Sequence, residues 1–301
     1  MSGRAQSLFL ATLLALVSSA SRGEEERDQK VWLRPVALFD QHLYEGAFGE
    51  PRGIFFDRAS GEVWVADTRN GRIGVLTPDG VPLYSFGLSD KVVEPIRLAV
   101  AKNGDVYVLG VDRSRIERFS YRGDHLGPLV LPGLPAKPAF GTLTVDSDGN
   151  LWVGENETGQ VLAFSPDFKP LLRLGALGDG DGQFQSIGGI AVAKDFVVVT
   201  DHQALAVQVF DRRGNFVRGW GRHDMGAANF SLPEGVALDP AGRIVVVDAL
   251  RHEIKLFNLE GVFLETTEPP LDERPTSRAD RKEPLSSERQ PVSPPTNDPK
   301  R

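Results

Sequence analysis

The chain has 301 residues, of which 41% are hydrophobic and 25% are charged, and its formal net charge is −7 at pH 7. This composition is typical of a soluble globular protein, and the negative charge argues against a protein that binds nucleic acid. The absence of cysteine excludes disulfide bonds, a thiol nucleophile and a cysteine-based zinc site.

An apolar segment near the N-terminus predicts a secretory signal peptide over residues 1–20. Residues 7–20 read SLFLATLLALVSSA, with Arg4 before them and the small residues Ser18 and Ala20 at the expected cleavage site. The run is too short to span a bilayer. An uncleaved N-terminal anchor is the alternative. We therefore expect an exported protein, periplasmic or extracellular, with a charged linker at residues 21–30 and no membrane span in the mature chain.

A single sequence pattern recurs five times along the rest of the chain. The copies begin 43 to 47 residues apart and align with one another without a gap. A period of this size indicates a ring or a stack of repeated supersecondary units. The five copies are residues 63–80, 106–123, 151–168, 197–214 and 244–261.

Each copy predicts four short antiparallel strands. In the first copy, the apolar runs are Gly53–Phe56, Val63–Ala66, Ile73–Leu76 and Pro82–Phe86, and turn-forming residues separate them. No segment after the leader shows the 3.6-residue period of a helix. A four-stranded sheet that repeats radially is the blade of a β-propeller. We predict an all-β propeller over residues 31–267 with five recognisable blades.

The closure of the ring is open at this point. Val36–Phe39 aligns with a fourth strand, so an N-terminal strand is expected to complete the last blade. Val262–Leu264 competes with it for the same position. A sixth, composite closing blade is the alternative to a five-bladed ring.

The last segment, residues 268–301, differs in composition from the repeats. It is rich in proline, serine and charges of both signs, and it has almost no large apolar residue. Such a segment does not bury enough surface to offset the entropy of ordering. We predict a disordered tail.

Several repeat residues resemble those of NHL repeats, from about residue 36 to residue 265. The resemblance implies a propeller of the bacterial, exported type, and many unrelated activities use that scaffold. The residues that carry it are Phe48, Pro51, Gly53, Ile54, Val63–Asp67, Asn70–Ile73, Gly180–Phe184, Gly189–Val192, Phe230, Pro233 and Gly235–Ala237.

Four of the five copies place an acidic residue at the end of the second strand: Asp67, Glu155, Asp201 and Asp248, with Gly110 in the remaining copy. One interpretation is an acidic circle at one face of the ring, where a cation or a ligand amine would bind. The other is that each carboxylate caps its own turn by accepting backbone N–H bonds. Turn capping is favoured, because a residue that recurs in nearly every unit usually has a structural role that every unit shares.

Two histidines, His202 and His252, break the repeat. Asp248-x-x-x-His252-x-Ile254 resembles a segment of the peptidyl-amidoglycolate lyases, which are propellers that hold zinc with histidines. The resemblance implies that His252 is a metal ligand, and Asp201 is the second candidate ligand. A turn histidine is the favoured alternative, because no trio of histidines occupies matching loops. No catalytic residue is predicted. The candidate binding residues are Asp67, Glu155, Asp201, His202, Asp248 and His252.

Two further patterns are given structural interpretations. The loop Gly178–Gly182 alternates glycine with Asp179 and Asp181, as a calcium loop would, but an ordinary NHL connection is favoured. Arginines concentrate in the first two copies, and we interpret them as a solvated face rather than an RNA-binding one. They are Arg69, Arg72, Arg113, Arg115 and Arg118.

Together these patterns predict an exported, monomeric NHL propeller that acts as a binding or scaffolding module. It would present one face of loops to a protein, peptide or glycan partner, without nucleic acid and without a cofactor. The alternative function is a metal-dependent lyase or hydrolase of the propeller type, with zinc or calcium bound.

Overall fold

The computed structural model describes residues 41–42, 46–88, 92, 94–221 and 226–267. All of them belong to the first of two units into which the chain divides, Met1–Glu268. The predicted signal peptide at 1–20, the linker at 21–30, the strand Val36–Phe39 and the tail at 268–301 lie outside the described residues.

Five four-stranded antiparallel sheets, each built of consecutive strands, make up the described fold and confirm the predicted blades. Blade 1 contains β3 (Pro51–Asp57), β4 (Glu62–Asp67), β5 (Arg72–Leu76) and β6 (Pro82–Gly87). Blade 2 contains β7 (Pro95–Val100), β8 (Val106–Gly110), β9 (Ile116–Phe119) and β10 (His125–Pro128). Blade 3 contains β11 (Phe140–Val145), β12 (Leu151–Glu155), β13 (Gln160–Phe164) and β14 (Pro170–Leu174).

The last two blades follow the same plan. Blade 4 contains β15 (Ile187–Val192), β16 (Phe196–Asp201), β17 (Ala206–Asp211) and β18 (Phe216–Trp220). Blade 5 contains β19 (Pro233–Leu238), β20 (Ile244–Asp248), β21 (Glu253–Phe257) and β22 (Phe263–Thr266). A short hairpin of β1 (Gln41–His42) and β2 (Gly46–Ala47) precedes blade 1, and a 3-10 turn, Gly226–Ala228, precedes blade 5.

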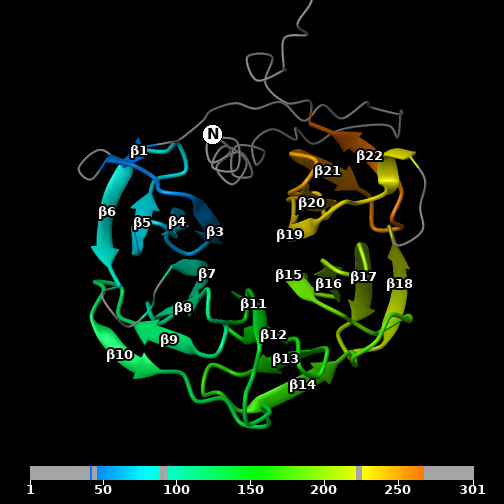
Figure 1. Ribbon diagram of the computed structural model, residues 1–301, viewed down its shortest axis with the longest axis horizontal. Coiled ribbons are helices and arrows are strands. Elements are labelled where there is room, and N and C mark those ends of the chain that lie inside the picture. The colour runs from blue at the N-terminus through cyan, green and yellow to red at the C-terminus, as the bar shows by residue number, and fades with distance from the viewer. Residues whose placement is uncertain (1–40, 43–45, 89–91, 93, 222–225, 268–301) are drawn as a thin grey trace, which may run out of the picture. The chain divides into compact units, whose positions relative to one another are not determined.

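The blades are arranged around a centre that is surrounded by their first strands (Figure 1). The first strands of consecutive blades, β3, β7, β11, β15 and β19, lie side by side in that order. In blade 5 the fourth position is taken by β22, the strand that competed with Val36–Phe39 for it. The described residues therefore contain five complete blades.

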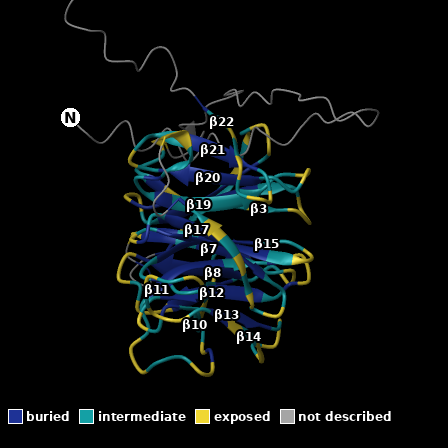
Figure 2. Cartoon of the chain, turned by 90° about the vertical axis from the view of Figure 1, so that its right-hand side faces the viewer, coloured by how far each residue is buried: buried dark blue, intermediate teal, exposed yellow. Residues whose placement is uncertain are grey.

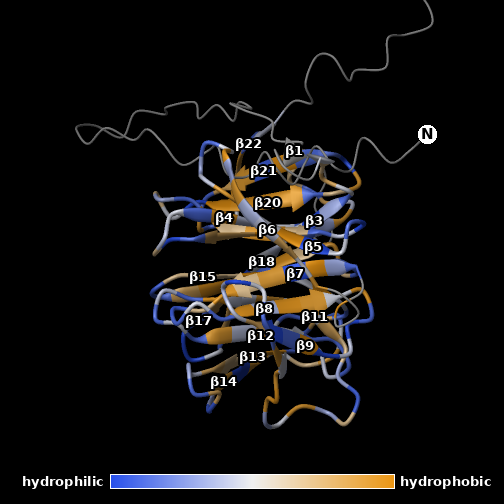
Figure 3. Cartoon of the chain, turned by 90° about the vertical axis from the view of Figure 1, so that its left-hand side faces the viewer, coloured by the Kyte–Doolittle hydropathy of each residue, from blue (hydrophilic) through white to orange (hydrophobic). Residues whose placement is uncertain are grey.

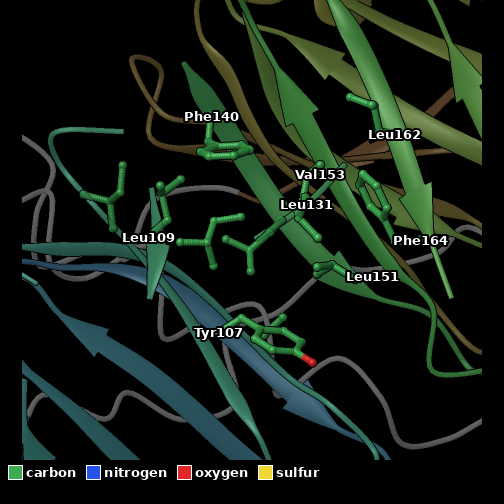
Figure 4. Close-up of a cluster of buried hydrophobic side chains, with 12 residues drawn as sticks. Tyr107, Leu109, Leu131, Phe140, Leu151, Val153, Leu162 and Phe164 are labelled. Carbon is green, nitrogen blue, oxygen red and sulfur yellow. The ribbon is translucent and has the colours of Figure 1, made fainter. Parts of the chain in front are cut away.

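The core lies between blades rather than inside one sheet, because both faces of each sheet are apolar. Blades 2 and 3 enclose a cluster that includes Tyr107, Leu109, Phe140, Leu151 and Phe164 (Figure 4). Burying a large apolar side chain stabilises the fold by about 1.5–3 kcal/mol. Figure 2 shows that the strands are mostly buried and that the connections at their ends are exposed. Figure 3 shows that many of the same strands are hydrophobic. This packing explains why the second strands read as continuous apolar runs instead of alternating ones.

The strand directions sort the connections onto two ends of the ring. Because strands alternate in direction, the connections between second and third strands share one end with the connections between blades. We call this end the loop face. The first strand of each blade begins at the loop face, and its pairing shifts register there, within a bulge. A bulge redirects a side chain, so these positions can differ between blades without changing the sheet.

Candidate functional site

The four acidic residues at the ends of the second strands are fully buried. Asp201 accepts hydrogen bonds from the backbone N–H groups of Gln185 at 2.7 Å, Ser186 at 3.1 Å, Gln203 at 2.9 Å and Ala204 at 2.9 Å. Its carboxylate thus joins the segment that enters blade 4 to the turn after β16.

Glu155 repeats this arrangement in blade 3. It accepts backbone bonds from Ala139 at 3.0 Å and from Glu157 and Thr158, each at 2.9 Å. In blade 1, Asp67 accepts a bond from the backbone N–H of Gly49 and pairs with buried Arg72 at 2.7 Å.

Asp248 combines backbone bonds with a buried cation. It accepts bonds from the N–H groups of Ser231 at 2.9 Å and Leu232 at 2.8 Å. Lys255, only 1% exposed, places Nζ 3.4 Å from the Asp248 carboxylate and donates to the carbonyl of Asn229. The Lys255 ammonium also lies 5.2 Å from the centre of the Phe230 ring.

These contacts favour turn capping over a cation site for Asp67, Glu155, Asp201 and Asp248. Their oxygens already accept bonds from the protein's own N–H groups, so a cation would compete with those donors. Among the described residues, no three His, Asp or Glu side chains form a group that could hold a metal ion. A direct role of these four residues in binding stays a prediction.

The hydrogen bonds to Glu155 predict a pH dependence of stability. Burial by itself would raise the pKa of Glu155, but the bonds from Ala139, Thr158 and Glu157 outweigh it and hold the pKa below its usual range. A carboxylate with a lowered pKa stabilises the fold above its unfolded pKa, and the contribution is lost as the pH falls through the folded pKa. Glu155→Gln is therefore expected to cost about 1–3 kcal/mol near neutral pH.

The difference in the free energy of unfolding between Glu155→Gln and the wild type should become smaller as the pH falls from about 5 to about 3. Urea unfolding at a series of pH values measures it. Glu157→Gln is the matched control, because Glu157 is exposed two residues away. A constant difference across this pH range would show that the carboxylate charge is not what stabilises the turn.

His252 lies in the turn between β20 and β21 with a left-handed backbone, φ +57°. The equivalent turns place Gly71 at φ +61°, Gly159 at +62° and Leu205 at +52° in the same position. The position is thus set by turn geometry, which favours the turn-histidine interpretation. His252 and Asp201, the two candidate metal ligands, belong to different blades. A metal role for them stays a prediction.

Replacing His252 with glycine tests the turn interpretation. Left-handed backbone costs a residue with a Cβ about 1–2 kcal/mol, and glycine avoids that cost at some expense in unfolded-state entropy. His252→Gly is expected to leave the free energy of unfolding unchanged or to raise it by up to about 1 kcal/mol. Leu250→Gly, in the same turn, is the control and should destabilise. A clear loss of stability, accompanied by loss of bound zinc, would favour the metal ligand instead.

His202 follows Asp201 and folds back over the first strand of its own blade. A Cβ on Gly188 would lie 2.1 Å from His202 Nε2, so glycine is needed there for the imidazole to fit. The Nε2 atom is buried and has no hydrogen-bond partner among the described residues. Burial lowers the pKa of His202, and the charges of Arg97 and Arg113 add to this while Glu234 opposes it. The imidazole is therefore neutral near pH 7.

His202 belongs to a group of polar residues at the loop-face end of the first strands. We call this group the axial cluster: Arg52, Arg97, Arg113, His202 and Glu234. Four blades contribute to it, and the first strands that hold three of its members surround the centre of the ring (Figure 1). The repeat pattern did not reveal Arg52, Arg97 or Glu234 as site residues.

An ion pair joins two members of the axial cluster. Arg97 Nη2, on β7, lies 2.9 Å from Glu234 Oε1, on β19, and joins blade 2 to blade 5. Arg97 Nη1 donates to the carbonyl oxygens of Arg52 at 3.1 Å and Ile96 at 2.9 Å. The side chain of Arg97 is only 13% exposed and that of Glu234 is 31% exposed. Burial by itself would raise the pKa of Glu234, but Arg97, His202 and Arg52 lower it below its usual range.

The structure corrects the interpretation of two arginines as part of a solvated face. Arg72 is buried and its Nε pairs with Asp67. Arg113 is half-buried in the axial cluster. In contrast, Arg69 is exposed and pairs with Glu50 at 3.3 Å. The loop Gly178–Gly182 is closed by the side chain of Gln183, which accepts a bond from the N–H of Gly180 at 2.9 Å.

Comparison with known families agrees with this architecture. The NHL repeat matches residues 48–76, which include the first three strands of blade 1. A family of 6-bladed β-propellers matches residues 179–282. The chain is an NHL-type β-propeller. The described part of this NHL propeller has five blades, whereas the matched family is described by six.

A curated relative of the NHL propeller is protein brain tumor of Drosophila melanogaster. The two are 27% identical over 125 residues, which cover 40% of this chain and 12% of that protein. The chain therefore spans far less than two thirds of that relative. No helix in the described part of the chain has the length and apolarity needed to cross a bilayer.

Solved structures at low identity share the fold. A catalytically inactive histidine-to-alanine variant of virginiamycin B lyase from Staphylococcus aureus, with quinupristin, has a TM-score of 0.54 at 18% identity, over 73% of this chain and 70% of that chain. A gluconolactonase from Xanthomonas campestris has a TM-score of 0.54 at 19% identity, over 75% and 77%. A chain of a nidogen/laminin complex has 0.56 at 15% identity, over 74% and 81%. These likenesses establish the propeller fold alone.

Proposed function

We propose that this NHL propeller is a binding module that holds its partner against the loop face. The observation that carries the proposal is the axial cluster. At the positions of the axial cluster, the residues differ from blade to blade. The polar side chains found there are not needed to form the blades. A rigid scaffold with variable residues at one end is how repeat folds present a binding surface.

Exposed apolar side chains surround this end of the ring and support the proposal. Val111 and Leu250 lie in turns between second and third strands and are 42% and 63% exposed. Val130 and Leu177 lie in the connections between blades and are 81% and 58% exposed. Aliphatic side chains around a polar centre suit a protein, peptide or glycan partner. The negative net charge argues against nucleic acid, and we propose that the module acts as an exported monomer.

Charged substitutions on the loop face test this function. The full-length protein, immobilised, is expected to recover a partner from the native medium, and Val111→Glu combined with Leu250→Glu should abolish the recovery. The control combines Val81→Glu with Val262→Glu, because these residues are comparably exposed in turns at the opposite end. Equal recovery by both double variants would place the binding surface elsewhere and refute the proposal.

A second candidate is a lyase or hydrolase, and His202 is the observation that favours it. A neutral, partly buried imidazole that interacts electrostatically with the carboxylate of Glu234 has the chemistry of a general base. Among the described residues, the ligands that a metal would need are not assembled. Asp201 accepts bonds from four backbone N–H groups, and His252 lies in a turn of another blade. The test is turnover of ester and amidoglycolate substrates, with and without chelator, by the wild type and by His202→Ala.

A further inference from the structure

Within the axial cluster, Arg113 lies in a turn where blade 2 departs from the repeated pattern. In blade 2 the capping carboxylate is replaced by Gly110, and the turn that follows takes a different path. Arg113 has a left-handed backbone, φ +55°, only three residues after Gly110. Its carbonyl accepts a bond from the N–H of Phe140 at 2.8 Å, which fixes this turn against blade 3.

The guanidinium of Arg113 is a cation without a counterion. Within the described part of the chain it makes no hydrogen bond and no ion pair, although the side chain is half-buried. Glu234 is already paired with Arg97 at 2.9 Å, and Arg52 is paired with Glu50 at 2.7 Å. Burial lowers the pKa of Arg113 and repulsion from Arg97 lowers it further, while attraction to Glu234 opposes them without outweighing them. Among the described residues, the carboxylates near Arg113 are thus already paired with other arginines, and its positive charge has no ion-pair partner of its own.

A second polar group lacks a partner next to this cation. The buried Nε2 of His202 makes no hydrogen bond within the part of the chain that the structure describes, and the imidazole interacts electrostatically with Glu234, Arg97 and Arg113. In the neutral tautomer with hydrogen on Nε2, the ring is a donor. A buried donor without a partner is costly in a folded protein unless a ligand satisfies it.

We propose that the axial cluster binds a carboxylate group of the partner, with Arg113 as its counterion and His202 Nε2 as a further donor. A guanidinium pairs with a carboxylate through two parallel N–H···O bonds, which gives orientation as well as affinity. The carboxylate comes from a peptide C-terminus or from an acidic sugar. This inference rests on the proposed binding function and names the chemical group that the loop face recognises.

Titrations of the full-length protein with matched small probes test the proposal. N-acetylalanine and glucuronate supply the two sources of carboxylate, and N-acetylalanine amide and glucose are their uncharged counterparts. Calorimetry, with NMR of the arginine Nε–H groups, measures the binding. We expect at least one carboxylate to bind and its uncharged counterpart not to bind. Arg113→Ala should weaken the affinity by about 10- to 100-fold.

The control is Arg122→Ala, which removes an exposed arginine of the same blade at the opposite end of the ring and should leave the affinity unchanged. Arg113→Lys keeps the positive charge but lacks the two parallel N–H groups of the guanidinium, and it should give an intermediate affinity. Circular dichroism melts confirm that each variant is folded. The proposal is overturned if neither carboxylate binds, if the uncharged probes bind equally, if inorganic phosphate binds better than both, or if Arg113→Ala binds like the wild type. Loss of partner recovery in the loop-face double variant, with no carboxylate binding, would leave the binding function intact and reject this inference alone.

Discussion

Asp201→Ala is expected to lower the free energy of unfolding by about 3–5 kcal/mol, because it removes the acceptor of several buried N–H groups at once. Two of these donors, Gln185 and Ser186, lie in the segment that enters blade 4, and two lie in the turn after β16. Alanine leaves a cavity between the two segments and removes the acceptor that these N–H groups have in the folded protein.

Urea unfolding followed by tryptophan fluorescence measures this effect. Asp195→Ala is the control, since Asp195 is an exposed residue of the same blade, and it should change the stability by less than about 0.5 kcal/mol. If Asp201→Ala were equally mild, the carboxylate would not be a structural cap. In that case the interpretation of Asp201 as a metal ligand would regain support.

Lys255→Met is expected to destabilise the protein by about 3–5 kcal/mol, because it leaves the buried carboxylate of Asp248 without its cation. Methionine has nearly the shape of lysine, so the packing against Phe230 is retained and the lost charge dominates. Arg251 lies 3.6 Å from Asp248 but is partly exposed, and it replaces the missing charge only in part. The same unfolding experiment applies, with exposed Lys194→Met as the control.

A double-mutant cycle separates the ion pair from the backbone bonds of Asp248. Asp248→Asn alone weakens the bonds from Ser231 and Leu232 as well as the pair with Lys255. The double variant should lose less unfolding free energy than the two single variants lose together, by roughly 1–3 kcal/mol. Strict additivity would show that Lys255 and Asp248 do not depend on each other.

Much of the fold was predictable because the repeated residues determine it locally. Apolar runs such as Val197–Thr200 and Ile244–Val247 form the second strands of blades 4 and 5. The capping role of the acidic residue at the end of each such strand was also predictable, because a side chain that caps a turn contacts backbone only a few residues away. Repetition thus revealed the architecture and the capping residues together.

The axial cluster could not be predicted in the same way. Arg97 and Glu234 are 137 residues apart, and only the arrangement of the blades around a common centre brings them together. Glu234 lies in the bulge at the start of its first strand, and Arg97 directly follows the bulge of blade 2. The residues in the bulge differ from blade to blade: Arg52, Ile96, Gly141, Gly188 and Glu234. The signal available in the sequence was the exception at Gly110, which marks the turn that carries Arg113.

The ion pair between Arg97 and Glu234 also constrains the order of assembly. Each blade is made of consecutive strands, so the first four blades can form as the chain is synthesised, from contacts between near neighbours in sequence. Glu234 belongs to the first strand of the last blade, so the pair must wait until blade 5 has emerged. The polar site at the centre is therefore completed only after the first four blades have been made, and a truncated product that ends before blade 5 would lack it.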